Sequence, residues 1–239
     1  MEGMIFAAGL GTRLRPLTDR KPKALAEVGG KTLLEGVLGR MREAGIGRIV
    51  VNVHHFAEQV EEFLQREGWL ADGVVVSDER EELLDTGGGL LKARGLFTPG
   101  ETVMVHNVDI YTEMDLRALA KTHGEGFATL AVRGAAPGRG LRFGADGRLK
   151  GWENSMTGER KVVGDGFEEA GRYGFCGVQV VSSEFLSGMK GRGRFSIIDE
   201  YLVQAAEHEV RMFFYGGRFL DLGTVEAVRE AEGWMTQGV

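Results

Sequence analysis

The first half of the chain alternates between short apolar runs and segments in which apolar residues recur at helical spacing. The runs are rich in β-branched residues and predict buried strands at 4–8, 49–53, 74–76 and 102–107. Apolar residues three and four positions apart predict helices at 32–44, 57–66, 86–97 and 115–123, the third of them entered from a loop. Thr32 and Asp115 stand at helix starts, where we expect them to act as N-caps. This order of strands and helices predicts a mainly parallel sheet that is covered on both faces.

The second half of the chain has shorter strands and fewer helices. Apolar runs predict strands at 128–132, 141–143, 149–152, 173–181 and 210–215, with helices at 183–189, 196–206 and 224–235. Asp146-Gly147 predicts a hairpin turn, and Thr224 is the expected cap of the last helix. Because no linker-like segment separates the halves, we expect a single α/β domain over residues 1–239, with a mixed, mainly parallel sheet flanked by helices.

The composition is that of a globular protein, with 43% hydrophobic and 27% charged residues. No apolar stretch reaches the length of a membrane helix, and Glu2 stands where a signal peptide carries bases. The single cysteine, Cys176, excludes an internal disulfide and a thiolate metal cage. We therefore expect a cytoplasmic protein without a membrane partner.

The net charge argues against one class of partner. At −6, the chain lacks the basic surface on which binding to nucleic acid usually depends. We expect no nucleic-acid partner, although a small anionic ligand remains compatible with a local cluster of bases.

Such a cluster follows the first predicted strand. Gly9 and Gly11 form a glycine-rich loop there, and Arg13, Arg15 and Lys23 lie close by in the sequence. Successive backbone N–H groups in a loop of this kind can bind phosphates at the carboxyl end of a strand. Leu14 breaks the dinucleotide-binding pattern G-x-G-x-x-G, and Leu25 stands where a P-loop requires its first glycine.

Residues 7–18, followed by Pro22-Lys23-Ala24-Leu25 and Val28, closely resemble the signature of the sugar-1-phosphate nucleotidylyltransferases. The resemblance implies a Rossmann-like nucleotidyltransferase fold. It assigns Arg13 and Lys23 to catalysis, beside the phosphates. The nucleotide-binding residues that it implies in this segment are Ala8, Gly9, Gly11, Thr12 and Arg13.

A second glycine cluster, Gly87-Gly88-Gly89, opens the helix predicted after position 86. Adjacent glycines let a flat ring approach the backbone closely. The resemblance implies that Thr86, Gly87 and Gly88 contact the base and ribose, and Asn107 is assigned to the nucleotide as well. The triple glycine is similar to that of the short bacterial N-acetylmuramate-1-phosphate uridylyltransferases.

Two aspartates are the expected metal ligands. Asp109 ends a predicted strand in the crevice of the phosphate loop, where a carboxylate suits Mg²⁺. The resemblance assigns Mg²⁺ to Asp109 and to Asp221, which belongs to a late motif at 219–224. Val108 departs from the family pattern, which usually has glycine before the first aspartate.

The sugar-binding side is less clear in the sequence. By resemblance, Glu153, Asn154 and Gly177 are the expected sugar-binding residues, but Asn154 replaces the lysine that would meet the sugar phosphate. Arg142 is a candidate replacement for that lysine. Cys176 is expected to be a core residue.

Two polar clusters invite other interpretations. His54-His55 has no third metal ligand nearby, so packed or solvated histidines are expected. The acidic run at 79–82 predicts a solvated loop.

The implied reaction converts an NTP and a sugar 1-phosphate to an NDP-sugar and pyrophosphate with Mg²⁺. UTP and an N-acetylmuramate- or hexose-type sugar are the expected substrates. Residues 1–125 would bind the NTP and residues 126–239 the sugar phosphate, in a monomer or simple homodimer. Alternatives are a mannose-1-phosphate guanylyltransferase, a phosphocholine cytidylyltransferase-like enzyme and a non-catalytic nucleotide-sugar sensor. Leu14 disfavours a NAD-binding protein.

Overall fold

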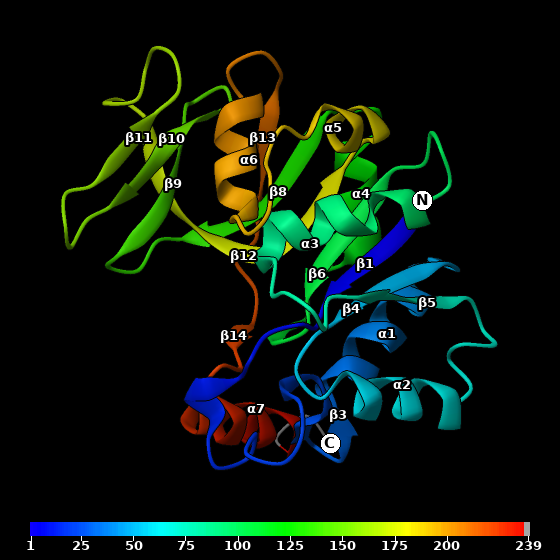
Figure 1. Cartoon of the computed structure of the whole chain (residues 1–239). Helices are drawn as coiled ribbons and strands as arrows, with labels where there is room; N and C mark the ends of the chain where they lie inside the picture. The colour runs from blue at the N-terminus through cyan, green and yellow to red at the C-terminus, as the bar shows by residue number, and fades with distance from the viewer. Residues whose placement is uncertain (237–239) are drawn as a thin grey trace.

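A computed structural model describes residues 1–236, which are arranged around one ten-stranded sheet (Figure 1). Its strands are β1 (Glu2–Phe6), β4 (Ile49–Val53), β5 (Val74–Asp78), β6 (Val103–Asn107), β8 (Ala128–Gly134), β9 (Arg139–Phe143), β10 (Leu149–Asn154), β11 (Arg160–Val162), β12 (Gly171–Val181) and β13 (Val210–Phe214). Two short pairs lie outside it, β2 (Glu27–Val28) with β3 (Lys31–Thr32) and β7 (Ile110–Thr112) with β14 (Phe219–Asp221).

The sheet has a parallel part and an antiparallel part. Strands β6, β1, β4 and β5 run parallel, with Met4 of β1 paired to Val50 on one side and Val105 on the other. Strand β12 runs antiparallel to β6 and joins the parallel part to β8 and to β9, β10 and β11, which extend at one side of the molecule (Figure 1). The expected mixed sheet is thus confirmed. Strands β6, β1, β4 and β5 of the first half are parallel, and in the second half β13 also runs parallel to β8.

Seven α-helices flank the sheet in the part of the chain that the structure describes. They are α1 (Leu33–Glu43), α2 (Ala57–Arg66), α3 (Asp85–Ala93), α4 (Leu116–His123), α5 (Ser183–Gly188), α6 (Ile197–Gln204) and α7 (Val225–Thr236). The three expected N-caps are confirmed, since Thr32, Asp115 and Thr224 accept hydrogen bonds from backbone N–H groups of the first turn. None of the helices in residues 1–236 is long and apolar enough to cross a membrane.

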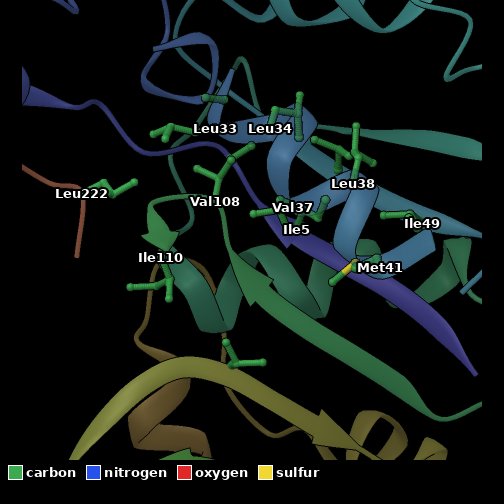
Figure 2. Close-up of a cluster of buried hydrophobic side chains, with 14 of the residues drawn as sticks. Ile5, Leu33, Leu34, Val37, Leu38, Met41, Ile49, Val108, Ile110 and Leu222 are labelled. Carbon is green, nitrogen blue, oxygen red and sulfur yellow. The ribbon is translucent and has the colours of Figure 1, made fainter. Parts of the chain in front are cut away.

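Each face of the sheet is buried under its own hydrophobic cluster. Figure 2 shows Leu38 and Met41 of α1 packed toward Ile5 of β1. Because side chains alternate along a strand, Met4 points to the opposite face and joins a second cluster with Leu90 of α3. Burial of each large side chain contributes about 1.5–3 kcal/mol, which holds helices on both faces as the sequence predicts.

The first strand is displaced from its predicted range of 4–8. It spans Glu2–Phe6, so Ala7 and Ala8 already belong to the loop. The Ala7 N–H donates to the side-chain Oδ1 of Asn52 at 2.7 Å, outside the ladder of the sheet. A side-chain acceptor on the neighbouring strand thus helps the chain leave the sheet two residues early.

Candidate active site

A cavity of about 260 Å³ lies at the carboxyl ends of β1, β4 and β6. Ligands of α/β sheets generally bind in this position. The residues that line it are Phe6, Ala8, Gly9, Lys23, Asn52, Leu83, Asp85, Thr86, Asn107, Val108, Asp109 and Arg194. Six of the expected site residues are thereby brought together: Ala8, Gly9, Lys23, Thr86, Asn107 and Asp109.

The glycine-rich loop is shaped by Gly11. This residue has φ +65°, in the left-handed region, and a Cβ there would lie 2.9 Å from Lys23 Cβ. The Thr18 hydroxyl donates to the Gly11 carbonyl at 2.8 Å and holds the loop over the lysine. Thr12 and Arg13 follow in a 3₁₀ helix. Glycine is therefore required at position 11 both by conformation and by space.

Lys23 and Asp109 form an ion pair at the cavity wall. Both side chains are largely buried, and a buried lysine is stable as a cation only beside such a partner. Lys23 begins a 3₁₀ helix directly after Pro22, and Asp109 follows β6. Tertiary structure thus joins a loop cation to a carboxylate 86 positions away.

The second aspartate lies beside the first. The N–H of Leu222, which follows Asp221, donates to the Asp109 carbonyl at 2.7 Å, and Asp221 is paired with Ile110 between β14 and β7. Arg13 Nη2 lies 3.7 Å from Asp221 Oδ2. The expected metal ligands are therefore neighbours, and each is accompanied by one of the two expected catalytic cations.

This donor set fits Mg²⁺ in one particular way. Within residues 1–236 there is no group of three or more acidic, histidine or cysteine side chains placed to hold a metal. Mg²⁺ commonly takes only one or two carboxylates and completes its octahedron with water and substrate phosphates. Two neighbouring carboxylates are compatible with that arrangement, and the assignment of Mg²⁺ to Asp109 and Asp221 remains a prediction.

The glycines of α3 pack against protein. The Gly87 and Gly88 N–H groups donate to the Phe195 carbonyl at 2.9 and 3.3 Å. A Cβ would overlap the Phe195 ring at Gly87 and the Gly193 carbonyl at Gly88. Close contact with the loop before α6 therefore accounts for both glycines. Thr86 alone of the three lines the cavity, and base and ribose contact remains a prediction for all of them.

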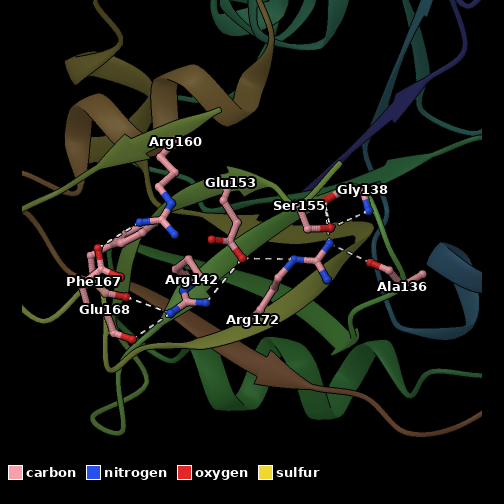
Figure 3. A network of polar contacts seen from close by, with 9 residues as sticks. All are labelled: Ala136, Gly138, Arg142, Glu153, Ser155, Arg160, Phe167, Glu168 and Arg172. Atoms are coloured by element: carbon pink, nitrogen blue, oxygen red, sulfur yellow. Dashed lines mark hydrogen bonds and ion pairs between the residues drawn. The ribbon is translucent and has the colours of Figure 1, made fainter. Parts of the chain in front are cut away.

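Glu153 lies between two arginines of the antiparallel strands (Figure 3). Its Oε1 is 3.4 Å from both Arg142 Nη1 and Arg172 Nε. Arg142 Nη2 also donates to the carbonyls of Phe167 and Glu168 at 3.0 Å each. Arg142 is thus engaged by Glu153 of β10 and by the segment between β11 and β12, and nothing in its contacts supports it as the replacement for the missing lysine.

The other two expected sugar-binding residues differ in position. Asn154 Oδ1 accepts the Met156 N–H at 3.0 Å and organises the turn between β10 and β11. Gly177, with φ +67°, lies against Asn107, because a Cβ there would be 2.8 Å from Asn107 Nδ2. Gly177 therefore adjoins the cavity, whereas Glu153 and Asn154 belong to the neighbouring antiparallel strands.

Arg194 is a cavity residue that the sequence analysis did not identify. It precedes α6, is exposed, and makes no ion pair or hydrogen bond with the part of the chain that the structure describes. The signal available in the sequence was the alternation of bases at Lys190, Arg192 and Arg194. An unpaired cation at the cavity favours the binding of anions there.

The expectation of a solvated loop at 79–82 is wrong for its first residue. Glu79 is completely buried, and burial raises the pKa of its carboxyl. Its carboxylate accepts hydrogen bonds from the Asn52 side chain and the Leu84 backbone, which satisfy it away from water. Cys176 is a buried core residue, as expected, and burial raises the pKa of its thiol to about 12.

Comparison with known proteins identifies the family of the chain. The model of the nucleotidyl transferase family matches residues 2–144. The N-acetylmuramate alpha-1-phosphate uridylyltransferase of Caulobacter vibrioides is 51% identical over 108 residues, 44% of each chain. That of Neisseria meningitidis serogroup B is 38% identical over 122 residues, 51% of this chain and 52% of the relative. The chain thus spans about half the length of these curated relatives.

A solved structure shows the same fold over nearly the whole length. HddC from Yersinia pseudotuberculosis, crystallised in complex with GMP-PN, has a TM-score of 0.77 at 19% identity and covers 98% of this chain and 99% of its own. This likeness confirms the expected Rossmann-like nucleotidyltransferase fold. With a family match over more than half of its residues, the chain belongs to the nucleotidyl transferase family.

Proposed function

We propose that this protein is a sugar-1-phosphate nucleotidylyltransferase, which converts an NTP and a sugar 1-phosphate to an NDP-sugar and pyrophosphate. One observation carries the proposal: a glycine-rich loop, Lys23 and Asp109 meet in one cavity, with Arg13 and Asp221 beside them. Cations and adjacent carboxylates around a phosphate loop suit the transfer of a nucleotidyl group.

The residues act mainly through position and charge. A phosphate oxygen of the sugar 1-phosphate attacks the α-phosphorus, the bond to the β-phosphate breaks, and pyrophosphate leaves. Lys23 and Arg13 offset negative charge on the phosphates as that bond breaks. Ala8, Gly9, Gly11 and Thr12 hold the triphosphate. Asp109 and Asp221 would hold Mg²⁺, which neutralises phosphate charge when it is bound. The attacking phosphate is already ionised, so no general base is required.

The substrates that we propose are UTP and N-acetylmuramate 1-phosphate. The 51% identity to the Caulobacter vibrioides uridylyltransferase over 108 residues supports this pair, as does the triple glycine at the start of α3. We also propose that residues 1–125 bind the nucleotide and residues 126–239 the sugar phosphate. Glu153, Asn154 and Gly177 are then the sugar-side residues to test.

The test is a measurement of pyrophosphate release with Mg²⁺. Each of the four NTPs is combined with the 1-phosphates of N-acetylmuramate, mannose and glucose, and with phosphocholine. Wild type is compared with Lys23→Ala and Asp109→Ala, and with Lys31→Ala as a control at an exposed lysine. The proposal is supported if pyrophosphate is released from one NTP–sugar pair and if Lys23→Ala and Asp109→Ala lose this release while Lys31→Ala keeps it. Release with phosphocholine alone, or with no pair, contradicts it.

A further inference from the structure

The buried carboxylate of Glu79 connects two walls of the cavity. Asn52, itself a lining residue, accepts the Ala7 N–H at its Oδ1 at 2.7 Å. Its Nδ2 donates to Glu79 Oε1 at 2.6 Å, and Glu79 Oε2 accepts the Leu84 N–H at 3.3 Å. Hydrogen bonds thus run without interruption from the glycine-rich loop, through the ends of β4 and β5, to the segment before α3.

Each end of this chain of hydrogen bonds borders a part of the site. Ala7 directly precedes Ala8 and Gly9, and Leu84 lies between the lining residues Leu83 and Asp85. Ala7 requires an acceptor, so the Asn52 side chain has only one possible orientation, with its NH₂ group toward Glu79. Glu79 therefore receives two donors, one from each wall.

The surroundings of Glu79 are built for a carboxylate of this size. Asn52 and Glu79 are 2% and 0% exposed. A Cβ at Gly89 of α3 would lie 2.8 Å from both Asn52 Nδ2 and Glu79 Oε1, so glycine at that position leaves room for the pair. Burial of a carboxylate is costly unless its acceptors are fully used. Its presence beside the cavity therefore calls for a role that an apolar residue could not fill.

We propose that Glu79 is a positioning residue for the nucleotide, which acts through Asn52 on the glycine-rich loop and through Leu84 on the lining segment before α3. It sets the distance between the two walls that receive the NTP, and it does not touch the substrate itself. This inference rests on the proposed function only in naming the NTP as the ligand of the cavity.

Two variants test the hydrogen bonds without changing shape. In Glu79→Gln, one oxygen and one NH₂ group replace two acceptors, so the NH₂ group faces either the Asn52 NH₂ group or the Leu84 N–H. The second is the double variant Asn52→Asp with Glu79→Gln. Its new carboxylate at position 52 accepts from Ala7 and from the new amide at position 79, and the oxygen of that amide accepts from Leu84. The double variant therefore keeps the charge and every hydrogen bond of the wild type.

The control is Glu81→Gln, which makes the same charge change at an exposed position in the same loop. Steady-state kinetics give KM for the NTP and for the sugar 1-phosphate separately, and calorimetry gives the Kd of each of the four NTPs with Mg²⁺. Circular dichroism at the assay temperature establishes that each variant is folded.

We expect Glu79→Gln to raise KM and Kd for the NTP about tenfold, the effect of one unmet buried donor, with KM for the sugar 1-phosphate unchanged. The double variant restores the wild-type value, and Glu81→Gln stays within about twofold of it. The inference is overturned if folded Glu79→Gln binds NTP with normal affinity, or if the double variant does not recover the wild-type affinity. Equal changes in KM for the NTP and for the sugar 1-phosphate would also overturn it. If wild type binds NTP but transfers no nucleotidyl group, the proposed function is refuted. The comparison of NTP Kd values among the variants still tests the inference.

Discussion

The pH dependence of stability should report one buried histidine in β6. His106 is 0% exposed, its Nδ1–H donates to the Asn107 carbonyl at 2.7 Å, and its Nε2 has no partner within residues 1–236. Burial, aided by the nearby positive charge of Arg40, lowers the pKa of His106 from 6.5 to about 4. The folded protein therefore keeps this ring neutral in a range where the unfolded chain protonates it.

The sign and size of the effect follow from that difference. Between pH 6.5 and pH 4 the unfolded state binds more protons at His106 than the folded state does. The contribution of His106 to the free energy of unfolding is therefore present above pH 6.5 and is lost as the pH falls. At ~1.4 kcal/mol per pH unit, a pKa of about 4 instead of 6.5 amounts to about 3 kcal/mol between neutral pH and pH 4. Glu79 acts in the opposite direction, because its raised pKa removes stability as the pH rises.

Urea unfolding of wild type and His106→Gln at several pH values between 4 and 7.5 isolates this contribution. The effect of Glu79 is common to both proteins and cancels in their difference. We expect the variant to be less stable than wild type at neutral pH. The difference between their free energies of unfolding should become smaller by about 3 kcal/mol toward pH 4. His55→Gln, at an exposed histidine, is the control for loss of an imidazole outside the core. If the free energies of unfolding of wild type and His106→Gln change in parallel with pH, the reasoning is refuted. An NMR titration that places the pKa of His106 near 6.5 would also refute it.

Three further substitutions follow from the structure. Leu38→Ala, at a completely buried position of α1 (Figure 2), should lower the free energy of unfolding in urea by about 2–5 kcal/mol. Gly11→Ala forces an added methyl toward Lys23 and strains a left-handed backbone, so kcat/KM for the NTP should fall at least about tenfold, and an unchanged value would contradict the loop geometry. Asp221→Asn should raise the Mg²⁺ concentration for half-maximal activity, while Asp165→Asn, at an exposed site, should not.

Local patterns determined much of the fold in advance. The apolar positions of α1 and its cap at Thr32 lie within a few residues of each other, so the helix could be predicted from spacing alone. The segment from Ala7 to Lys23 is also contiguous, and it carries most of the candidate nucleotide site. Strand β11, at Arg160–Val162, could not be predicted because its three residues are all exposed and carry no burial pattern.

The sequence by itself determined the alternation of strands and helices, the glycine-rich loop and the identity of the candidate cations and carboxylates, because these depend on short-range order. Only the tertiary structure decided which of them meet. It paired Lys23 with Asp109, brought Asp221 beside them, and buried Glu79 from within an acidic run. It also placed Arg194 at the cavity. Sheet register and helix packing create these contacts between residues that lie far apart in the sequence, where no local pattern records them.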